Sequence, residues 1–335
     1  MNKLASVEEV LAVKPILGAD RIELVQVLGY QSIVRKGEYK AGDKVIFVFP
    51  DTTIKRAPWN EFLFKEGETS TRIKTVRMRG EVSQGLVFPV SILGFDPVVG
   101  QDVAENIGVE KWEMEMPAQL RGTMEGYRPW YVPKTDESNI QSYPGVILEM
   151  TGKECVATLK MDGSSASFFW KDGNFGVTSR NIHLKKDESN SFWQAAIKYS
   201  LEEKLNSLAR NIVIQSELCG PGIRENKLKL KEFQVFAFDV YDIDRGNYLP
   251  YDEALSLLKE LGVPTVPEIC IWEDFTLSLE DLVALANQQK YPEDPAEGIV
   301  VRCTDGRISQ FLKGSRLSVK VMNQIFEEKY CKSRK

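Results

Sequence analysis

Histidine is almost absent from this chain, because His183 is the only one among 335 residues. Metal sites built from several imidazoles are therefore excluded, and catalysis by a histidine acid or base is disfavoured. We expect any catalysis to depend on lysine, aspartate and glutamate.

Cysteines are also few and scattered. They number five, an odd count without any CxxC spacing: Cys155, Cys219, Cys270, Cys303 and Cys331. This pattern predicts neither a disulfide framework nor a zinc cluster. We expect reduced, mostly structural thiols.

Long hydrophobic runs are missing as well. No apolar stretch approaches the ~20 residues of a helix that spans a bilayer. The first residues, MNKLASVEEV, lack the apolar core of a signal peptide. We therefore expect a cytoplasmic protein that makes no membrane contact.

No strong charge excess is present, since 43 Lys and Arg stand against 48 Asp and Glu, a net charge of −5. Phosphate binding depends on local patches rather than on this total. Basic residues cluster without acids at 72–79, and residues 302–335 carry nine Lys or Arg against three acids. Each cluster is either a phosphate-binding patch or a solvated charged face.

The length of the chain suits two domains. In the first, residues 1–108, short strands from about residue 20 to 107 alternate with turn material such as KAGD and EVSQ. Five such strands predict an OB-type β-barrel, whose open face commonly binds nucleic acid. The alternative is a barrel that only docks on its neighbour.

Residues 109–142 have mixed composition with interrupting Gly and Pro, and we predict a connector there. Beyond it, residues 143–335 alternate apolar strands with helical periodicity near 191–209, 251–261 and 279–289. The predicted fold class of the chain is α+β.

Lys160, Asp162 and Gly163 belong to the tetrapeptide KMDG, which directly follows an apolar strand. This position puts a lysine amine at a strand end that faces a cleft. Alone, the tetrapeptide is equally compatible with a strand that ends in an Asp-Gly turn.

Further residues whose side chains can take part in catalysis or binding follow it on apolar strands: Glu217, Phe236, Phe238, Asp239, Glu297 and Lys320. The order lysine, glutamate, aromatic, glutamate, lysine resembles that of the covalent nucleotidyltransferases, which comprise ATP-dependent DNA ligases, RNA ligases and mRNA capping enzymes. The resemblance covers residues 135–323. It implies an adenylyltransferase domain, ATP-grasp-like with antiparallel sheets, in which Lys160 and Lys320 are catalytic.

A lysine amine attacks the α-phosphate of ATP only when neutral, so nearby cations must lower its pKa. Lys320 and a metal could supply that field. Asp162, Glu217 and Glu297 offer the oxygen ligands that Mg²⁺ or Mn²⁺ prefers.

The resemblance also implies nucleotide contacts. Glu217 would contact the ribose, and Arg180 the ribose or a substrate phosphate, although a surface salt bridge also explains Arg180. Phe236 and Phe238 lie on one face of a strand, where either could stack on adenine or pack in the core. The family alignment favours Phe238.

Two segments are similar to RNA ligases that carry an amino-terminal OB domain. One is PKTDESNIQ, which ends in Gln141, a predicted nucleotide contact. The other is the RGxxSQG stretch that begins at Arg79, which together with Arg77 is a predicted RNA contact.

The segment GPGIRENKLKLK, residues 220–231, also resembles this family. It offers Arg224, Lys227 and Lys229 as RNA phosphate contacts. An exposed strand edge protected by lysines is an equally good explanation.

The last family motif departs from its usual form, which has two lysines as KxK. Here Lys320 is followed by Met322 in the second position, and Lys313 is a candidate substitute at the nucleotide. His183 is either an RNA contact or a local hydrogen-bonding residue.

The barrel precedes the nucleotide domain, whereas typical DNA ligases and capping enzymes carry it afterwards. We therefore expect a monomeric ATP-dependent RNA ligase that seals 3′-OH and 5′-phosphate RNA ends, most suitably in a nicked duplex. The alternatives are an ATP-dependent DNA ligase and a non-catalytic, OB-containing RNA-binding protein, the latter motivated by Met322.

Overall fold

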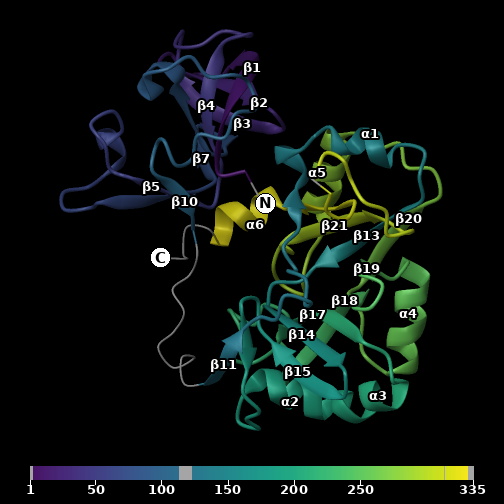
Figure 1. The fold of residues 1–335 in the computed structure, drawn as a ribbon. Helices are drawn as coiled ribbons and strands as arrows, with labels where there is room; N and C mark the ends of the chain where they lie inside the picture. Colours follow the sequence, from purple (N-terminus) through teal and green to yellow (C-terminus); the bar gives the residue numbers. More distant parts are fainter. Residues whose placement is uncertain (1–2, 113–122, 313, 331–335) are drawn as a thin grey trace. The chain divides into compact units, whose positions relative to one another are not determined.

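The computed structural model describes residues 3–112, 123–312 and 314–330 (Figure 1). Its internal contacts divide the chain into two units. The N-terminal unit contains 3–112, Ser138–Pro144 and α6 (Gln324–Tyr330), and the C-terminal unit contains 123–137 and 145–323. The predicted boundaries at 108 and 142 remain a prediction.

The N-terminal unit is built on an antiparallel sheet in the order β3-β2-β1-β4-β9. Its strands are β1 (Ala5–Pro15), β2 (Ile22–Val27), β3 (Tyr30–Arg35), β4 (Lys44–Val48) and β9 (Leu86–Pro89). Successive residues of β4 enter different cores: Ile46 packs with Val7, and Phe47 packs with Val10. Strand alternation explains this two-sided burial.

Smaller elements complete this unit. A three-stranded sheet has the order β10-β5-β6, and β7 pairs with β8. Their bounds are β5 (Thr52–Lys55), β6 (Ser70–Ile73), β7 (Val76–Met78), β8 (Glu81–Ser83) and β10 (Val109–Lys111), with 3₁₀ turns η1 (Glu61–Leu63) and η2 (Val90–Leu93). Strand β12 (Ser138–Asn139) and turn η4 (Ile140–Ser142) also belong to this unit.

The larger sheet of the C-terminal unit has the order β11-β16-β15-β14-β17-β18-β19. It comprises β11 (Met124–Tyr127), β14 (Ser164–Lys171), β15 (Asn174–Thr178), β16 (Ile182–Leu184), β17 (Ile212–Cys219), β18 (Gln234–Asp242) and β19 (Asn247–Tyr248). The helices α2 (Ser191–Lys198), α3 (Leu201–Leu208) and α4 (Tyr251–Glu260) contribute apolar side chains to the same core as this sheet.

A second sheet of this unit holds the KMDG lysine. Its strands run β22-β21-β13-β20 and are all antiparallel. They are β13 (Cys155–Lys160), β20 (Glu268–Trp272), β21 (Gly298–Cys303) and β22 (Ser318–Met322), accompanied by α1 (Val146–Met150) and α5 (Leu279–Gln288). The predicted α+β class with antiparallel sheets is thus confirmed.

Within the described residues, no helix has the length and apolar character needed to cross a membrane.

Candidate active site

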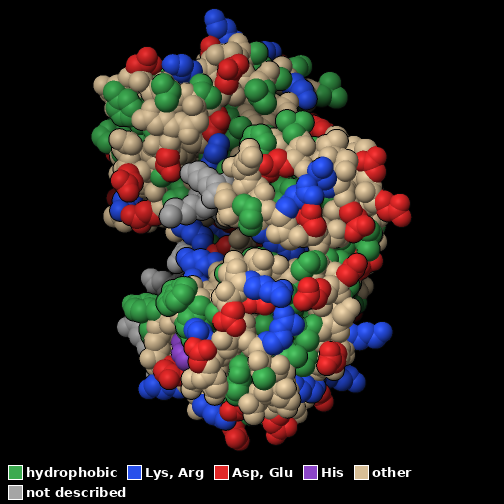
Figure 2. Space-filling view, turned by 45° about the vertical axis from the view of Figure 1, so that its right-hand side comes forward, with side chains coloured by type: hydrophobic (Ala, Val, Ile, Leu, Met, Phe, Trp, Pro, Cys, Tyr) green, Lys and Arg blue, Asp and Glu red, His purple; other side chains and the backbone are tan. Residues whose placement is uncertain are grey.

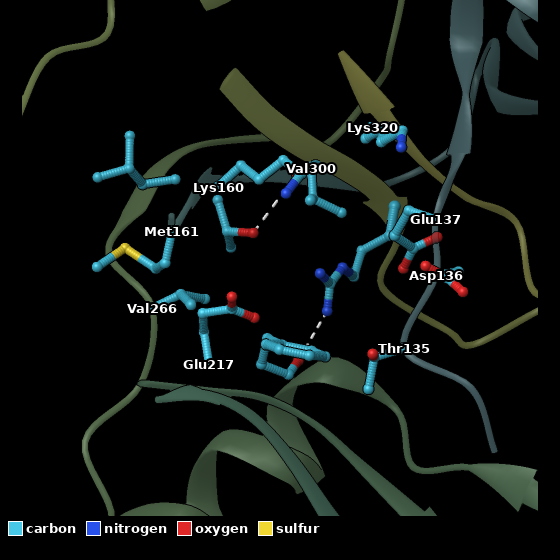
Figure 3. A pocket seen from close by; sticks show the side chains of 13 residues that line it. Thr135, Asp136, Glu137, Lys160, Met161, Glu217, Val266, Val300 and Lys320 are labelled. Carbon is cyan, nitrogen blue, oxygen red and sulfur yellow. Dashed lines mark hydrogen bonds between the residues drawn. The ribbon is translucent and has the colours of Figure 1, made fainter. Parts of the chain in front are cut away.

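A pocket in the C-terminal unit collects residues from both sheets and from the segment 135–137 (Figure 3). Its walls are formed by Thr135, Asp136, Glu137, Thr158, Leu159, Lys160, Met161, Glu217, Phe238, Val266, Val300, Arg302 and Lys320. Four predicted site residues therefore line one pocket although they are far apart in the sequence: Lys160, Glu217, Phe238 and Lys320.

Lys160 is the last residue of β13, where it lies opposite Gly298 of β21. Its Nζ donates a 2.7 Å hydrogen bond to Oε2 of Glu297. The hydroxyl of Tyr291 donates to the Lys160 carbonyl at 2.6 Å and accepts from the Glu297 N–H at 3.3 Å. Tyr291 thereby fixes the backbone of both partners, whose side chains are joined by the Lys160–Glu297 hydrogen bond.

The electrostatic surroundings of Lys160 are acidic rather than basic. Burial alone would lower its pKa, but the charges of Glu297 and Glu217 and the hydrogen bond to Glu297 outweigh burial, so the pKa is raised. The amine is consequently an ammonium group in the free protein. The prediction that nearby cations, among them Lys320 and a metal, lower this pKa stays a prediction for the enzyme with its nucleotide and metal bound.

Glu217 extends from β17 toward the same space, and its Oε1 accepts the Gly163 N–H at 3.0 Å. Burial raises its pKa to about 8, Lys160 opposes that rise, and Glu297 and Asp162 add to it. A carboxylate destabilised by burial and by like charges is one that a bound cation would stabilise.

The three carboxylates predicted to bind metal have different partners here. Glu297 pairs with Lys160, Glu217 accepts from the Gly163 backbone, and Asp162 forms a buried ion pair with Lys227. Within the described residues, no group of three or more His, Cys, Asp or Glu is arranged to hold a metal. The oxygen donors of Glu217 and Glu297 fit a hard divalent cation. The assignment of all three carboxylates as metal ligands stays a prediction.

The two phenylalanines of β18 lie differently. Both pack on a small cluster with Met161 and Val266, but only Phe238 is among the pocket walls. Its carbonyl accepts a 2.7 Å hydrogen bond from Arg302. Phe238 is therefore the ring that a ligand in the pocket would meet, and which of the two rings stacks on adenine stays a prediction.

Lys320 lies on β22 opposite Val300 and lines the pocket, whereas Met322 lies opposite Gly298. Lys313, the candidate substitute, is outside the described residues.

Arg302 is a pocket residue that the sequence analysis missed. It is 1% exposed and donates to Oδ1 of Asp239 at 3.0 Å. Arg316 bonds the same carboxylate, and the hydroxyl of Ser318 donates to Glu137 at 2.8 Å. An arginine inside the apolar strand GIVVRC was the available signal, because a buried guanidinium requires a partner.

Arg180 forms a 2.7 Å ion pair with Asp136, one of the pocket walls. Gln141 lies in the N-terminal unit, where its Nε2 donates to the Gly29 carbonyl at 2.9 Å and to Gln84 at 3.2 Å. Its predicted nucleotide contact stays a prediction.

The basic residues predicted to contact RNA are partly engaged within the protein. Arg77 forms a bidentate pair with Glu328, and Arg79 is an exposed residue with a positive φ of 54°. Acidic and basic side chains are interspersed on the face shown in Figure 2. The Nε2 of His183 lies 3.7 Å from Oε2 of Glu125, and both explanations given for His183 stay open.

Residues 220–231 form consecutive turns rather than the strand edge considered as an alternative. Arg224 donates to the Gly163 carbonyl at 3.0 Å, and the exposed Lys229 pairs with Glu293 at 3.2 Å. The side chain of Lys227 is 2% exposed, and its amine forms an ion pair with Asp162. The predicted RNA phosphate contact of Lys227 would require this pair to open.

The antiparallel N-terminal sheet, followed along the chain by a two-sheet unit with a lysine at a strand end, fits a ligase of the covalent nucleotidyltransferase class. An RNA ligase family model matches residues 153–322, and an OB-fold domain model matches residues 4–90. The chain therefore belongs to the RNA ligase family and has an amino-terminal OB-fold domain. A search of curated proteins found no match.

Solved structures of Naegleria gruberi RNA ligase are similar over the whole chain. A lysine-to-alanine mutant with ATP and Mn is 33% identical, with a TM-score of 0.89 over 98% of this chain and 99% of that one. A glutamate-to-alanine mutant with AMP and Mn has the same values. The enzyme with PPi is 32% identical, with a TM-score of 0.88 over 99% of this chain and 100% of that one.

Proposed function

We propose that this enzyme joins RNA 3′-OH and 5′-phosphate ends through an AMP adduct on Lys160, with ATP as the AMP donor and Mg²⁺ or Mn²⁺ as cofactor. The observation that carries this proposal is the Lys160 amine, which lies in a pocket with Glu217, Phe238 and Lys320 and 2.7 Å from Glu297. The similar ligases solved with ATP or AMP and Mn support the choice of nucleotide and metal.

In the first step, Nζ of Lys160 attacks the α-phosphorus of ATP, a P–N bond forms, and pyrophosphate leaves. The attack requires the ammonium to lose its proton, for which Glu297 is the nearest acceptor. A divalent cation at Glu217 and Glu297 would offset the carboxylate charges that hold this proton and would stabilise the phosphates. Lys320 would stabilise the leaving group, and Phe238 would offer its ring to the adenine.

In the second step, an oxygen of the RNA 5′-phosphate attacks the AMP phosphorus and Lys160 is released. The RNA 3′-OH then attacks the activated 5′-phosphate, a phosphodiester bond forms, and AMP departs. Positioning and charge stabilisation suffice for these transfers, which agrees with a pocket of lysine, arginine and carboxylate side chains.

Covalent labelling tests the first step. Incubation with α-labelled ATP and Mg²⁺ should label the wild-type protein, and Lys160→Ala should abolish the label. Lys153→Ala, an exposed lysine just before the same strand, should label normally. Label that persists in Lys160→Ala would exclude this nucleophile, and a wild-type protein that binds RNA but never accepts label would favour the non-catalytic alternative.

The RNA specificity is tested with two nicked duplexes that differ only in the sugar of the 3′-OH strand. The proposed function predicts faster sealing when that strand is RNA. Equal sealing of both substrates would favour a DNA ligase. The cytoplasmic location and the monomeric state remain predictions from the sequence.

A further inference from the structure

One buried hydroxyl bonds the main chain of both residues whose side chains meet at the proposed nucleophile. Tyr291 is 4% exposed. Its hydroxyl donates to the Lys160 carbonyl at 2.6 Å and accepts from the Glu297 N–H at 3.3 Å. A tyrosine hydroxyl can make both bonds because it is a donor and an acceptor. The same group therefore connects two residues that are 137 positions apart in the chain.

Lys160 and Glu297 lie where the pairing of β13 with β21 stops. Lys160 is the last residue of β13, and its partner Gly298 is the first residue of β21. Glu297 precedes the first paired residue of β21, so the register of the strands does not fix it. Its N–H donates to Tyr291 instead, and its carbonyl accepts from the Asn323 N–H at 3.0 Å. Tyr291 thus links the two strands just beyond the point where they cease to pair.

The loop between α5 and β21 anchors the tyrosine itself. The Tyr291 N–H donates to the Asp294 carbonyl at 2.7 Å, and the Ala296 N–H donates to the Gln289 carbonyl at 3.0 Å. The Nδ2 of Asn323, directly after β22, donates to the same Gln289 carbonyl at 3.3 Å. These bonds on both sides of Tyr291, together with its burial, hold the hydroxyl in place between its two partners.

We propose that Tyr291 is a positioning residue for the transfer of AMP to Lys160. The amine must lose its proton and approach the α-phosphorus in line, and both events depend on where Lys160 and Glu297 lie relative to each other. Tyr291 is not among the pocket walls, so it acts through the main chain of these two residues and not through the nucleotide. The inference rests on the proposed function and adds a residue that the reaction requires.

Removal of the hydroxyl alone tests this role, because Tyr291→Phe keeps the buried ring. Single-turnover labelling with α-labelled ATP should be about 10- to 100-fold slower at saturating ATP, since a small misplacement of reacting groups has a large effect on the rate. The ATP concentration that gives half the maximal rate should stay at the wild-type value, because the pocket walls are unchanged.

Tyr251→Phe is the matched control. Tyr251 is 5% exposed, belongs to the same unit and donates its hydroxyl to Oε2 of Glu268 at 3.0 Å. The control therefore also loses one hydrogen bond of a buried tyrosine, but not at Lys160. It should accept label at the wild-type rate.

A second substrate separates positioning from a loss of structure. RNA that already carries AMP on its 5′-phosphate is sealed without attack by the Lys160 amine. Tyr291→Phe should therefore seal this RNA at close to the wild-type rate, which also shows that the variant is folded.

Labelling of Tyr291→Phe at the wild-type rate overturns the positioning role. An equal loss in Tyr251→Phe, or an equal loss with the adenylylated RNA, also overturns it, because the effect would then be structural. A higher half-saturating ATP concentration with an unchanged maximal rate would assign Tyr291 to nucleotide binding instead. A wild-type protein that accepts no label overturns the proposed function itself, so the two failures are distinguishable.

Discussion

At the scale of single residues, the central feature is the proposed nucleophile, Lys160, which the free protein keeps protonated. Lys160 needs a neutral amine to attack phosphorus, yet Glu297 and Glu217 raise its pKa despite burial. The same carboxylates are the oxygen donors available to a divalent cation. In the proposed mechanism their charge disfavours attack until a cation is bound, which would link activation of Lys160 to metal binding.

This electrostatic coupling can be measured in the metal-free protein. Glu297→Gln should lower the pKa of Lys160, because it removes the nearest negative charge and the charge-assisted hydrogen bond. In the wild-type protein the Lys160 ammonium persists up to its raised pKa. In the variant, Lys160 should therefore lose its proton at a lower pH. NMR titration of ¹³C-labelled lysine would follow it. Glu293→Gln, which alters an exposed carboxylate paired with Lys229, should leave the pKa of Lys160 unchanged. The same Lys160 pKa in both variants would contradict the coupling.

Asp162 and Lys227 allow a second test at this scale. Lys227→Met should leave a buried carboxylate without its cation and destabilise the protein by about 3–5 kcal/mol. Lys229→Met breaks an exposed pair two residues away and should cost about 0–1 kcal/mol. Urea unfolding followed by circular dichroism would compare them. Equal free energies of unfolding for the two variants would show that the buried pair is no more stabilising than the exposed pair.

At the scale of elements, the strands β13, β21 and β22 bring Lys160, Glu297 and Lys320 together through their register. Gly298 lies at the centre, opposite both Lys160 and Met322, with φ of 150°. A Cβ at this position would collide with the Val321 carbonyl. Glycine is therefore required for three strands to approach at the point where the proposed catalytic groups meet.

Gly298→Ala should consequently destabilise this sheet by several kcal/mol, on the order of 3, from overpacking and an unfavourable φ. The rate of label transfer from ATP to Lys160 should fall as well. Gly126→Ala is the matched control, because its Cβ meets no atom within 4 Å. The idea is refuted if denaturant unfolding and label transfer are the same in both variants.

The sequence was sufficient for elements whose signal is local. Alternating apolar residues predicted strands of the first domain from about residue 20 onward and the strand that ends at Lys160, but not β1 (Ala5–Pro15). Helical periodicity predicted α4 and α5 closely. Partnerships across long sequence separations left no such signal. Arg302 with Asp239 and Tyr291 with Lys160 arise only when strands pair, and the burial of Lys227 follows from the position of Asp162.

At the scale of the whole molecule, the chain passes repeatedly between the two units. Residues 138–144 and α6 belong to the N-terminal unit, although the strand β22 that carries Lys320 immediately precedes α6. In α6, the buried Glu327 accepts hydrogen bonds from Thr75 at 3.1 Å and from Gln84 at 3.4 Å. The last helix is therefore a structural part of the first domain.

Glu327→Ala should accordingly destabilise the N-terminal unit by about 1–3 kcal/mol, because buried polar groups lose their acceptor. Lys329→Ala, an exposed residue of the same helix, should change stability by less than about 0.5 kcal/mol. Hydrogen exchange at the amides of β7 and β8 would report the effect. Loss of protection confined to the C-terminal unit would contradict this assignment of α6.

The most direct measurement of the central claim is tandem mass spectrometry of the protein after reaction with ATP and Mn²⁺ without RNA. AMP attached to Nζ of Lys160, and lost on addition of 5′-phosphorylated RNA, is the predicted result. AMP on a different residue, or an adduct on Lys160 that RNA does not discharge, would contradict it.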